Sequence, residues 1–219
     1  MSADRSRPIF SRIWPGLARR MDGGGMREHR RELLAGLSGE VLEVGAGTGA
    51  NFALYPPEVR RVVAVEPERR LRRFAELEAV GAAADITVVL GTAEALPFPD
   101  SSFDAVVYSL VLCSVDDQAR ALREARRVLR PGGEVRVLEH VRSLHPWVGR
   151  GQDILDATIY PLVSGGCHMG RDTAAAMRSG GFDVQRLRRF RWPPGRLALP
   201  TSQHIIGTAR NPSDAIRHH

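Results

Sequence analysis

The amino-acid sequence predicts a doubly wound α/β fold with a mostly parallel sheet. Short apolar segments alternate with longer amphipathic ones through the middle of the chain. The apolar segments are hydrophobic at nearly every position, as expected for strands covered by helices on both faces. A glycine-rich turn, Gly45–Gly49, directly follows the first apolar segment. Folds of this class bind ligands at the carboxyl ends of their strands, so this turn marks the expected site.

Five apolar segments in this region predict the strands of the sheet. Each is short and is bounded by turn residues, which is the usual pattern of a buried strand. In chain order they are Glu40–Val44, Arg61–Glu66, Ile86–Leu90, Phe103–Leu110 and Glu134–Glu139.

Amphipathic segments between the strands predict the helices. Residues 5–37 favour one or two helices broken at Gly23–Gly25. Asp116–Leu129 is expected to be a helix stopped by Pro131-Gly132-Gly133, with Ala121, Leu122, Ala125, Val128 and Leu129 facing inward. Glu68–Val80 predicts another helix, whose apolar face consists of Leu71, Phe74, Leu77 and Val80.

The periodicity weakens after the fifth expected strand. His145–Arg178 is interpreted as an insertion followed by a helix, and Phe182–Phe190 and His204–Ala209 as two late strands. The predicted organisation is an N-terminal helical cap segment over residues 1–35, one domain over 36–210 and a flexible tail over 211–219.

Composition and charge restrict the class of protein. The net charge is +6, and all 31 basic residues are Arg, but the Arg-rich runs are interrupted by acidic residues. Such runs are typical of solvated helix faces, so nucleic acid is not expected as a partner. We find no apolar run near the roughly 18 residues of a membrane span and no signal peptide, which predicts a cytoplasmic protein. Cys113 and Cys167 are far apart, and no metal site is expected.

The segment Glu40–Asn51, EVLEVGAGTGAN, carries the chemistry. Glycines let the backbone turn sharply and approach a ligand closely. The glycine spacing does not exclude a dinucleotide-binding site, because Ala50 completes the pattern GxGxxA, which dinucleotide-binding enzymes tolerate. Glu43 would repel a pyrophosphate but would suit an ammonium group, which favours S-adenosylmethionine (SAM). Glu66 follows 23 residues later, where an acid accepts ribose hydroxyls in nucleotide-binding α/β folds.

The sequence resembles the class I SAM-dependent methyltransferases with a methyltransferase type 11 domain. The resemblance implies a Rossmann-like sheet, with the N-terminal helices and the insertion after strand five as a cap. It also implies that the glycine turn holds the methionine part of SAM, Glu66 the ribose and residues 92–94 the adenine, although Thr92 is often Asp in the family. The matching segments are LEVGAGTG (42–49), VEP (65–67), GTAEALPFPDSSFD (91–104) and RVLRPGG (127–133). The expected cofactor residues are Glu43, Gly45, Ala46, Gly47, Gly49, Asn51, Glu66, Pro67, Thr92, Ala93, Glu94 and Ser109.

A narrower resemblance concerns the methyl acceptor. Several segments are similar to a methyltransferase-like family whose better-known members are microsomal alkyl-thiol methyltransferases. Those members carry an N-terminal hydrophobic anchor that this sequence lacks, which leaves peripheral membrane contact open. The segments are GANFALYPP (49–57), LVLCSVDDQ (110–118), LEHV (138–141) and GCHMGRDT (166–173).

The expected reaction is methyl transfer from SAM to a small molecule, with a thiol sulfur as the favoured acceptor. A thiol reacts as its thiolate, so a base or a cationic group near the acceptor would help. The catalytic candidates are His140, Asp156 and His168. The sequence leaves open a quinone-type or phospholipid-amine acceptor, a SAM-binding partner subunit without activity, a nicotinamide oxidoreductase, and a monomer or a homodimer.

Overall fold

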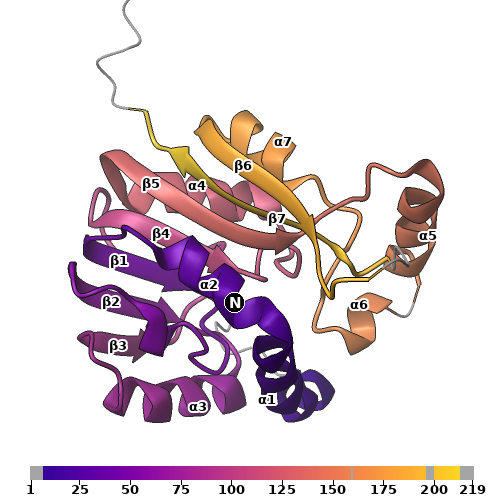
Figure 1. Cartoon of the computed structure of the whole chain (residues 1–219). Coiled ribbons are helices and arrows are strands. Elements are labelled where there is room, and N and C mark those ends of the chain that lie inside the picture. Colours follow the sequence, from indigo (N-terminus) through magenta and orange to yellow (C-terminus); the bar gives the residue numbers. More distant parts are fainter. Residues whose placement is uncertain (1–6, 159, 196–199, 213–219) are drawn as a thin grey trace, which may run out of the picture.

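The computed structural model describes residues 7–158, 160–195 and 200–212. Its centre is one seven-stranded sheet with the order β3-β2-β1-β4-β5-β7-β6 (Figure 1). The first five strands of that order are parallel to their neighbours, whereas β7 runs antiparallel to both β5 and β6. The strands are β1 (Gly39–Val44), β2 (Val59–Val65), β3 (Ile86–Val89), β4 (Phe103–Ser109), β5 (Leu129–His140), β6 (Asp183–Arg191) and β7 (Gln203–Arg210). The mostly parallel, doubly wound sheet that the sequence predicts is confirmed.

Apolar side chains on both faces of the sheet explain why its strands are hydrophobic throughout. Val41 and Leu42 are adjacent in β1, and neither side chain is exposed. They belong to two different core clusters, because successive side chains of a strand point to opposite faces. The sheet therefore separates two cores, each of which needs its own cover of helices.

Helices supply that cover on both sides of the sheet. Those predicted after β2 and β4 are present, and the carboxylates of Glu68 and Asp117 cap their first turns. The four α4 side chains expected to face inward are all buried. The helices are α1 (Pro8–Met21), α2 (Arg27–Leu34), α3 (Arg69–Val80), α4 (Gln118–Val128), α5 (Pro146–Asp156), α6 (Tyr160–Val163) and α7 (Thr173–Ser179), with short turns at η1 (Asp22–Met26) and η2 (Phe52–Leu54).

Three local predictions were wrong. Leu77 and Val80 of α3 are 72% and 87% exposed, because the helix buries the narrower face that carries Leu71 and Ala75. The Pro-Gly-Gly segment that starts at Pro131 does not stop α4. It lies inside β5, whose pairing with β4 begins at Leu129 and shifts register before residue 134. The predicted tail starts too early, since the side chain of Asn211 is buried and donates to the carbonyls of Arg126 in α4 and of Leu129 directly after it. The rest of that prediction, from residue 213 on, lies outside the described residues.

The N-terminal helices and the insertion are placed to form a cap. Figure 1 shows α5 and α6 beyond the end of β5, on the same side of the molecule as α1. The kink between α1 and α2 occurs at the predicted glycine run, where Gly25 has a φ of 101°. Trp192 donates a hydrogen bond to the carbonyl of Gly24 at 2.9 Å and so fixes this kink. Within the described ranges, no helix is long and apolar enough to cross a membrane.

Candidate active site

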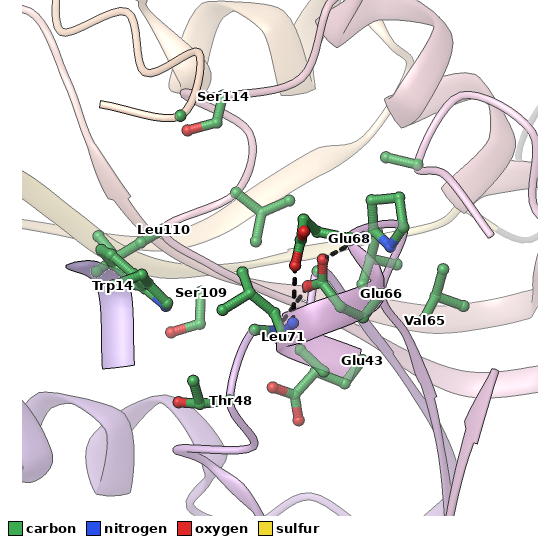
Figure 2. A pocket seen from close by; sticks show the side chains of 18 of the residues that line it. Trp14, Glu43, Thr48, Val65, Glu66, Glu68, Leu71, Ser109, Leu110 and Ser114 are labelled. Atoms are coloured by element: carbon green, nitrogen blue, oxygen red, sulfur yellow. Dashed lines mark hydrogen bonds between the residues drawn. The ribbon is translucent and has the colours of Figure 1, made fainter. Parts of the chain in front are cut away.

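A pocket opens where β1, β2 and β4 end, and it encloses about 960 Å³ when the space at its mouth is included (Figure 2). Of the twelve residues expected to bind the cofactor, eleven line it: Glu43, Gly45, Ala46, Gly47, Asn51, Glu66, Pro67, Thr92, Ala93, Glu94 and Ser109. The structure thus brings together residues spread over more than 60 positions of the sequence.

The glycine turn forms the floor of the pocket. The amide groups of Gly45 and Ala46 donate to the carbonyl of Val65, at 2.7 and 3.1 Å, which joins the turn to the end of β2. Gly45 has a φ of 72°, and a Cβ atom there would lie 2.6 Å from the side chain of Val111. Only glycine fits this backbone conformation and this close contact, so the sequence of the turn is explained by its geometry.

Gly49 is the one predicted cofactor residue that does not line the pocket. Its φ is 80°, and a Cβ atom there would lie 2.8 Å from the ring of Phe52 and 3.0 Å from Cβ of Glu78. The glycine therefore lets η2 and α3 pack closely behind the turn.

Gly49→Ala is expected to lower the free energy of unfolding by about 1–3 kcal/mol, because a strained backbone and an overpacked contact add. Urea denaturation measures this loss. Gly36→Ala is the matched control, since that glycine also has a positive φ but has nothing within 4 Å of its added Cβ. An equal loss in both variants would show that backbone strain alone is responsible and that the packing contact is unimportant.

Glu66 lies directly after β2, and 5% of its surface is exposed. Its two carboxylate oxygens accept hydrogen bonds from the backbone amides of Gly47, at 2.7 Å, and Glu68, at 2.9 Å. Figure 2 shows Glu66 and its bond to Glu68. Burial raises the pKa of Glu66 to about 7, and the two amide bonds oppose that rise. The carboxylate is thus held rigidly at the place where a ribose is expected.

Glu43 is a second buried acidic residue of the pocket. Asn51 Nδ2 and Tyr55 Oη donate to its two oxygens, at 2.8 and 2.6 Å. Burial raises the pKa of Glu43 to about 7, while the bonds from Tyr55 and Asn51 and the charge of Arg30 oppose the rise. A cation entering the pocket would further favour the ionised form of this carboxylate.

Arg30 is a pocket residue that sequence reasoning missed. It lies in α2 and is 3% exposed. Its guanidinium donates to Asn51 Oδ1 at 3.2 Å, to Ser109 Oγ at 2.8 Å and to Asp22 Oδ1 at 3.0 Å. The cation thereby orients the amide that bonds to Glu43. No sequence signal distinguishes this arginine from the exposed arginines beside it, because its burial arises only when α2 packs over β5 and β7.

The far end of the pocket, where the adenine is expected, is lined by Thr92, Ala93 and Glu94. Thr92 pairs with residue 95 in an isolated bridge, which fixes this turn. Glu94 Oε1 accepts the backbone amide of Asp116 at 2.9 Å, so that carboxylate also orders the start of the segment before α4. Pro67, the residue after Glu66, also lines the pocket.

The N-terminal segment lies over the pocket, where the sequence predicts a cap, although its individual lining residues were not predicted. Phe10, Trp14 and Ala18 of α1 line the pocket, and the rings of Phe10 and Trp14 stack with centroids 5.1 Å apart. The guanidinium of Arg7 donates to the carbonyls of Ser114 and Gly165, joining the loop after β4 to the insertion. Side chains of α1 and the insertion thus form a largely apolar cover.

The three catalytic candidates do not appear among the described residues that line the pocket. Asp156 accepts the backbone amides of Met169 and Gly170, at 2.8 and 2.7 Å, and so orders the loop before α7. His168 Nδ1 lies 2.8 Å from the carbonyl oxygen of Gly166. The contacts of Asp156 and His168 hold the backbone of the loop before α7 in place. The catalytic roles of His140, Asp156 and His168 stay predictions.

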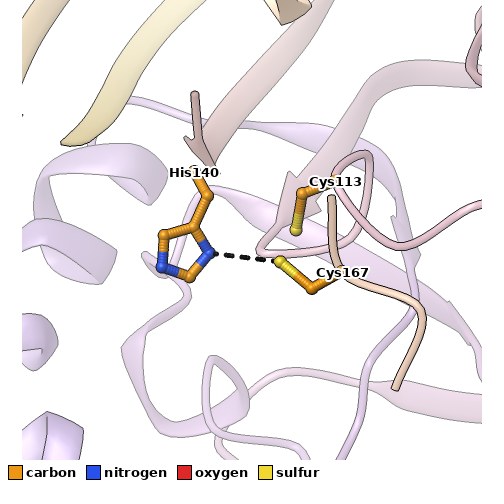
Figure 3. A group of neighbouring side chains, drawn as sticks. All are labelled: Cys113, His140 and Cys167. Atoms are coloured by element: carbon orange, nitrogen blue, oxygen red, sulfur yellow. Dashed lines mark hydrogen bonds between the residues drawn. The ribbon is translucent and has the colours of Figure 1, made fainter. Parts of the chain in front are cut away.

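His140 instead meets two cysteines behind the pocket wall (Figure 3). Its Nδ1 atom lies 3.8 Å from Cys167 Sγ, and Cys113 completes a group whose ligand atoms all lie within 4.8 Å of one another. Hydrogen bonds from Cys113 and His140 lower the pKa of the Cys167 thiol, whereas the pKa of Cys113 is raised. The three residues are about 27 positions apart in sequence, so their spacing gave no indication of this group.

The buried carboxylate of Glu139 shapes the wall between that group and the pocket. Glu139 is fully buried at the end of β5, and its oxygens accept the backbone amides of Val111, Leu112 and Cys113 at 2.8, 2.9 and 3.2 Å. These bonds hold the loop after β4, in which Leu110 has a φ of 62°. A non-glycine residue keeps such a conformation only where its surroundings enforce it.

Comparison with known proteins agrees with this arrangement. A family model described as a methyltransferase domain matches residues 42–137. Thiol S-methyltransferase TMT1B of Homo sapiens is 35% identical over 196 residues, which cover 84% of this chain and 79% of that protein. TMT1A of Homo sapiens is 36% identical, with the same coverage. The ubiquinone/menaquinone C-methyltransferase UbiE of Hahella chejuensis is 35% identical over 128 residues, 56% of this chain and 51% of that protein.

Solved structures show the same fold. A SAM-dependent methyltransferase of Thermotoga maritima, described as a possible histamine N-methyltransferase, superposes with a TM-score of 0.69 at 24% identity, over 93% of this chain and 98% of that one. A putative methyltransferase in complex with the Trm112 activator of Haloferax volcanii reaches a TM-score of 0.72 at 16% identity, over 98% and 100%. The chain belongs to the SAM-dependent methyltransferase family that includes these thiol S-methyltransferases.

Proposed function

We propose that this enzyme binds SAM in the pocket between the glycine turn and α1 and transfers its methyl group to a small thiol. The observation that carries the proposal is the pair of buried carboxylates, Glu43 and Glu66, which face one pocket from the ends of neighbouring strands. Two carboxylates suit a ligand that has an ammonium group and a ribose and no phosphate. The thiol S-methyltransferases of Homo sapiens support the sulfur acceptor, and they match more of the chain than UbiE does.

The residues present fit the cofactor. Gly45 and Gly47 have positive φ values, and an added Cβ atom would lie 2.6 Å from Val111 at the first and 3.2 Å from Trp14 at the second, so only glycines let these two side chains line the pocket so closely. When bound, SAM supplies an electrophilic methyl group on a sulfonium sulfur. Glu66 and Glu43 would hold its ribose and ammonium ends, and Thr92, Ala93 and Glu94 would lie along its adenine. Arg30 would act as a positioning residue, because it orients Asn51 and Ser109 rather than the ligand itself.

The protein's own contribution to methyl transfer is orientation in a site that excludes water. Phe10 and Trp14 cover the pocket from α1, and Val111 and Leu110 form its wall on the side of β4. An apolar enclosure removes the hydration shell of a nucleophile and holds the reacting atoms in line, and both effects lower the barrier to displacement. Catalytic roles for His140, Asp156 and His168 remain part of the proposal, in which α5 and the loop before α7 would form the acceptor side.

Transfer of labelled methyl groups from SAM to a panel of small thiols, quinols and phospholipid amines tests the proposal. Turnover on thiols, lost in Glu66→Ala, is the expected result. SAM binding without turnover on any thiol would exclude the sulfur acceptor and favour the quinone-type or phospholipid-amine alternative. SAM binding without turnover on any member of the panel would instead indicate a non-catalytic partner subunit.

The affinity for SAM is expected to fall as the pH drops below about 7, because Glu43 and Glu66 have pKa values near 7. Glu43 must ionise to bind the ammonium group, and Glu66 must ionise to accept hydrogen bonds from both ribose hydroxyls. Binding near neutral pH should therefore release protons, which calorimetry in buffers of different ionisation enthalpy measures. Affinity that is constant between about pH 5.5 and 8 would contradict this coupling. Glu66→Gln is the control, since it removes one of the two groups and should reduce the proton release.

The stability of the ligand-free protein should change with pH in the opposite direction. The folded-state pKa values of Glu43 and Glu66 are raised above the unfolded value of 4.5, so folding favours their protonated forms. Their contribution to stability is full below that value and is lost as the pH rises through about 7. SAM should consequently raise the melting temperature more at a pH above 7 than at a pH well below it.

We further propose a cytoplasmic location and a monomer or homodimer that works without a nucleic-acid partner. Both cysteines are free thiols although they lie close together, which suits a reducing compartment. Peripheral membrane contact through α1 also belongs to the proposal. That helix exposes Ile9 and Ile13, at 62% and 58%, beside several arginines. Cosedimentation with anionic vesicles tests this contact.

A further inference from the structure

The group formed by Cys113, His140 and Cys167 has the composition of a zinc site. Its three ligand atoms come from three separate elements and lie within 4.8 Å of one another. Zinc binds thiolate sulfur at about 2.3 Å and imidazole nitrogen at about 2.0–2.1 Å in tetrahedral geometry. Ligand atoms on one ion are then about 3.6–3.8 Å apart. The measured distance from His140 Nδ1 to Cys167 Sγ is 3.8 Å, so this pair already has the required separation.

We propose that Cys113, His140 and Cys167 bind one Zn²⁺ ion, and that the fourth coordination position of this ion takes the sulfur of the acceptor thiol. The second half rests on the proposed thiol acceptor, whereas the ion site stands on geometry alone. Soft thiolate ligands together with an imidazole select zinc over magnesium or calcium, which bind oxygen.

The backbone around the group holds the ligands in place. Cys113 lies in the loop that Glu139 fixes through a hydrogen bond to the Cys113 amide at 3.2 Å. The amide of His168 donates to the carbonyl of Cys113 at 2.7 Å, so the two cysteine-bearing loops are joined directly. His140 is the last residue of β5, a rigid element. Ligands preorganised in this way lose little conformational entropy when an ion binds.

Burial and charge also suit the ion. Cys113 and Cys167 are 1% and 5% exposed, and they pack with Met169 in a small apolar cluster. Binding would release the two thiol protons to solvent, and the two thiolates would then balance the double charge of the ion. His140 would coordinate through Nδ1 as the neutral imidazole, with its proton on Nε2. No net charge would be buried, which avoids the main cost of placing an ion in an apolar environment.

Catalytic zinc sites have three protein ligands and keep the fourth coordination position for water or a reactant. Ser114 follows Cys113 and lines the pocket, as does Gly165, two positions before Cys167. Neighbours of two of the three ligands thus line the pocket, and in this proposal the open position is directed toward it. A thiol binding there would lose its S–H proton to solvent while its sulfur donates an electron pair to the ion. Zinc lowers the pKa of a bound thiol, and the thiolate is the nucleophilic form.

Titration of the metal-free, reduced full-length protein with Co²⁺ tests the site, because cobalt replaces zinc and absorbs through thiolate-to-metal charge transfer. We expect one ion per chain, displaced by Zn²⁺. Affinity should fall on the order of 100-fold in Cys113→Ser, Cys167→Ser and His140→Ala, since each removes a ligand. His145→Ala, which removes an exposed histidine outside the group, is the matched control and should bind cobalt as the wild type does. Retained SAM binding shows that each variant is folded.

Equal cobalt affinity in wild type and Cys167→Ser, or a complex without the charge-transfer absorption, would overturn the ion site. Protection of both thiols from alkylation by zinc gives a second readout, and unprotected thiols would likewise overturn it. Adding a small thiol to the cobalt-loaded protein should shift the absorption, and an unchanged spectrum would overturn the assignment of the fourth position. Absent thiol turnover by the zinc-loaded enzyme, with cobalt binding intact, would count against the proposed thiol acceptor and leave the ion site standing.

Discussion

Replacing Glu66 by Ala is expected to weaken SAM binding on the order of 100-fold. A carboxylate at this place accepts hydrogen bonds from ribose hydroxyls, and bonds to a charged group contribute about 1.5–3 kcal/mol each. Losing about 3 kcal/mol corresponds to roughly a 100-fold change in the dissociation constant. Glu66 is 5% exposed, and the amides of Gly47 and Glu68 hold its carboxylate in one position. The carboxylate is therefore already oriented before the ribose binds, and its removal takes away that preformed acceptor. Isothermal titration calorimetry measures the affinity directly.

Two variants sharpen the test. Glu66→Gln keeps one acceptor oxygen and should lose roughly tenfold, because one charge-assisted bond becomes a neutral one. Glu58→Ala removes an exposed carboxylate just before β2 and should bind SAM as the wild type does. Circular dichroism confirms that each variant folds. If Glu66→Ala bound SAM within a factor of two of the wild type, the pocket would not hold a ribose at this carboxylate.

The sheet could be predicted because its information is local. Each strand has its own apolar run and its own turn residues, and the glycine turn reveals its conformation through residue type. The buried face of α3 could not be assigned from the sequence. Ala75 is buried and the larger Leu77 is exposed, because the way the helix packs on the sheet decides which side chains are covered. The extent of β5 was missed because a Pro-Gly-Gly sequence usually ends an element, whereas here it forms an irregularity within a paired strand.

The site shows the same division between local and distant information. The cofactor residues follow strands directly, so the topology alone brings them to one edge of the sheet. Arg30 and Glu139 act through contacts with segments 21 or more positions away, and no pattern in the sequence marks them. The group of Cys113, His140 and Cys167 depends on the loop before α7 folding back over β5. Residue type alone therefore led us to expect no metal site, whereas the fold places three zinc-type ligands together.

Glu139→Ala is expected to lower the free energy of unfolding by about 3–5 kcal/mol, a large part of the roughly 5–15 kcal/mol of a typical domain. The carboxylate is completely buried, and it accepts three backbone amides of the loop after β4. Removing it leaves three buried N–H groups without acceptors, and each costs about 1–3 kcal/mol. The loop includes Leu110 and Val111, which line the pocket, so SAM affinity should fall as well. Urea denaturation with an unchanged m-value measures the stability.

Glu139→Gln separates the role of the hydrogen bonds from that of the charge. Its side-chain oxygen can still accept the amides of Val111 and Leu112, whereas its NH₂ group faces the amide of Cys113, the longest of the three bonds. We expect a loss of about 1 kcal/mol, because one modest bond is exchanged for a repulsive contact. Equal losses in the Ala and Gln variants would mean that the negative charge holds the loop and that the count of bonded amides is irrelevant. A loss confined to Glu139→Ala would establish this glutamate as the residue that gives the pocket wall its shape.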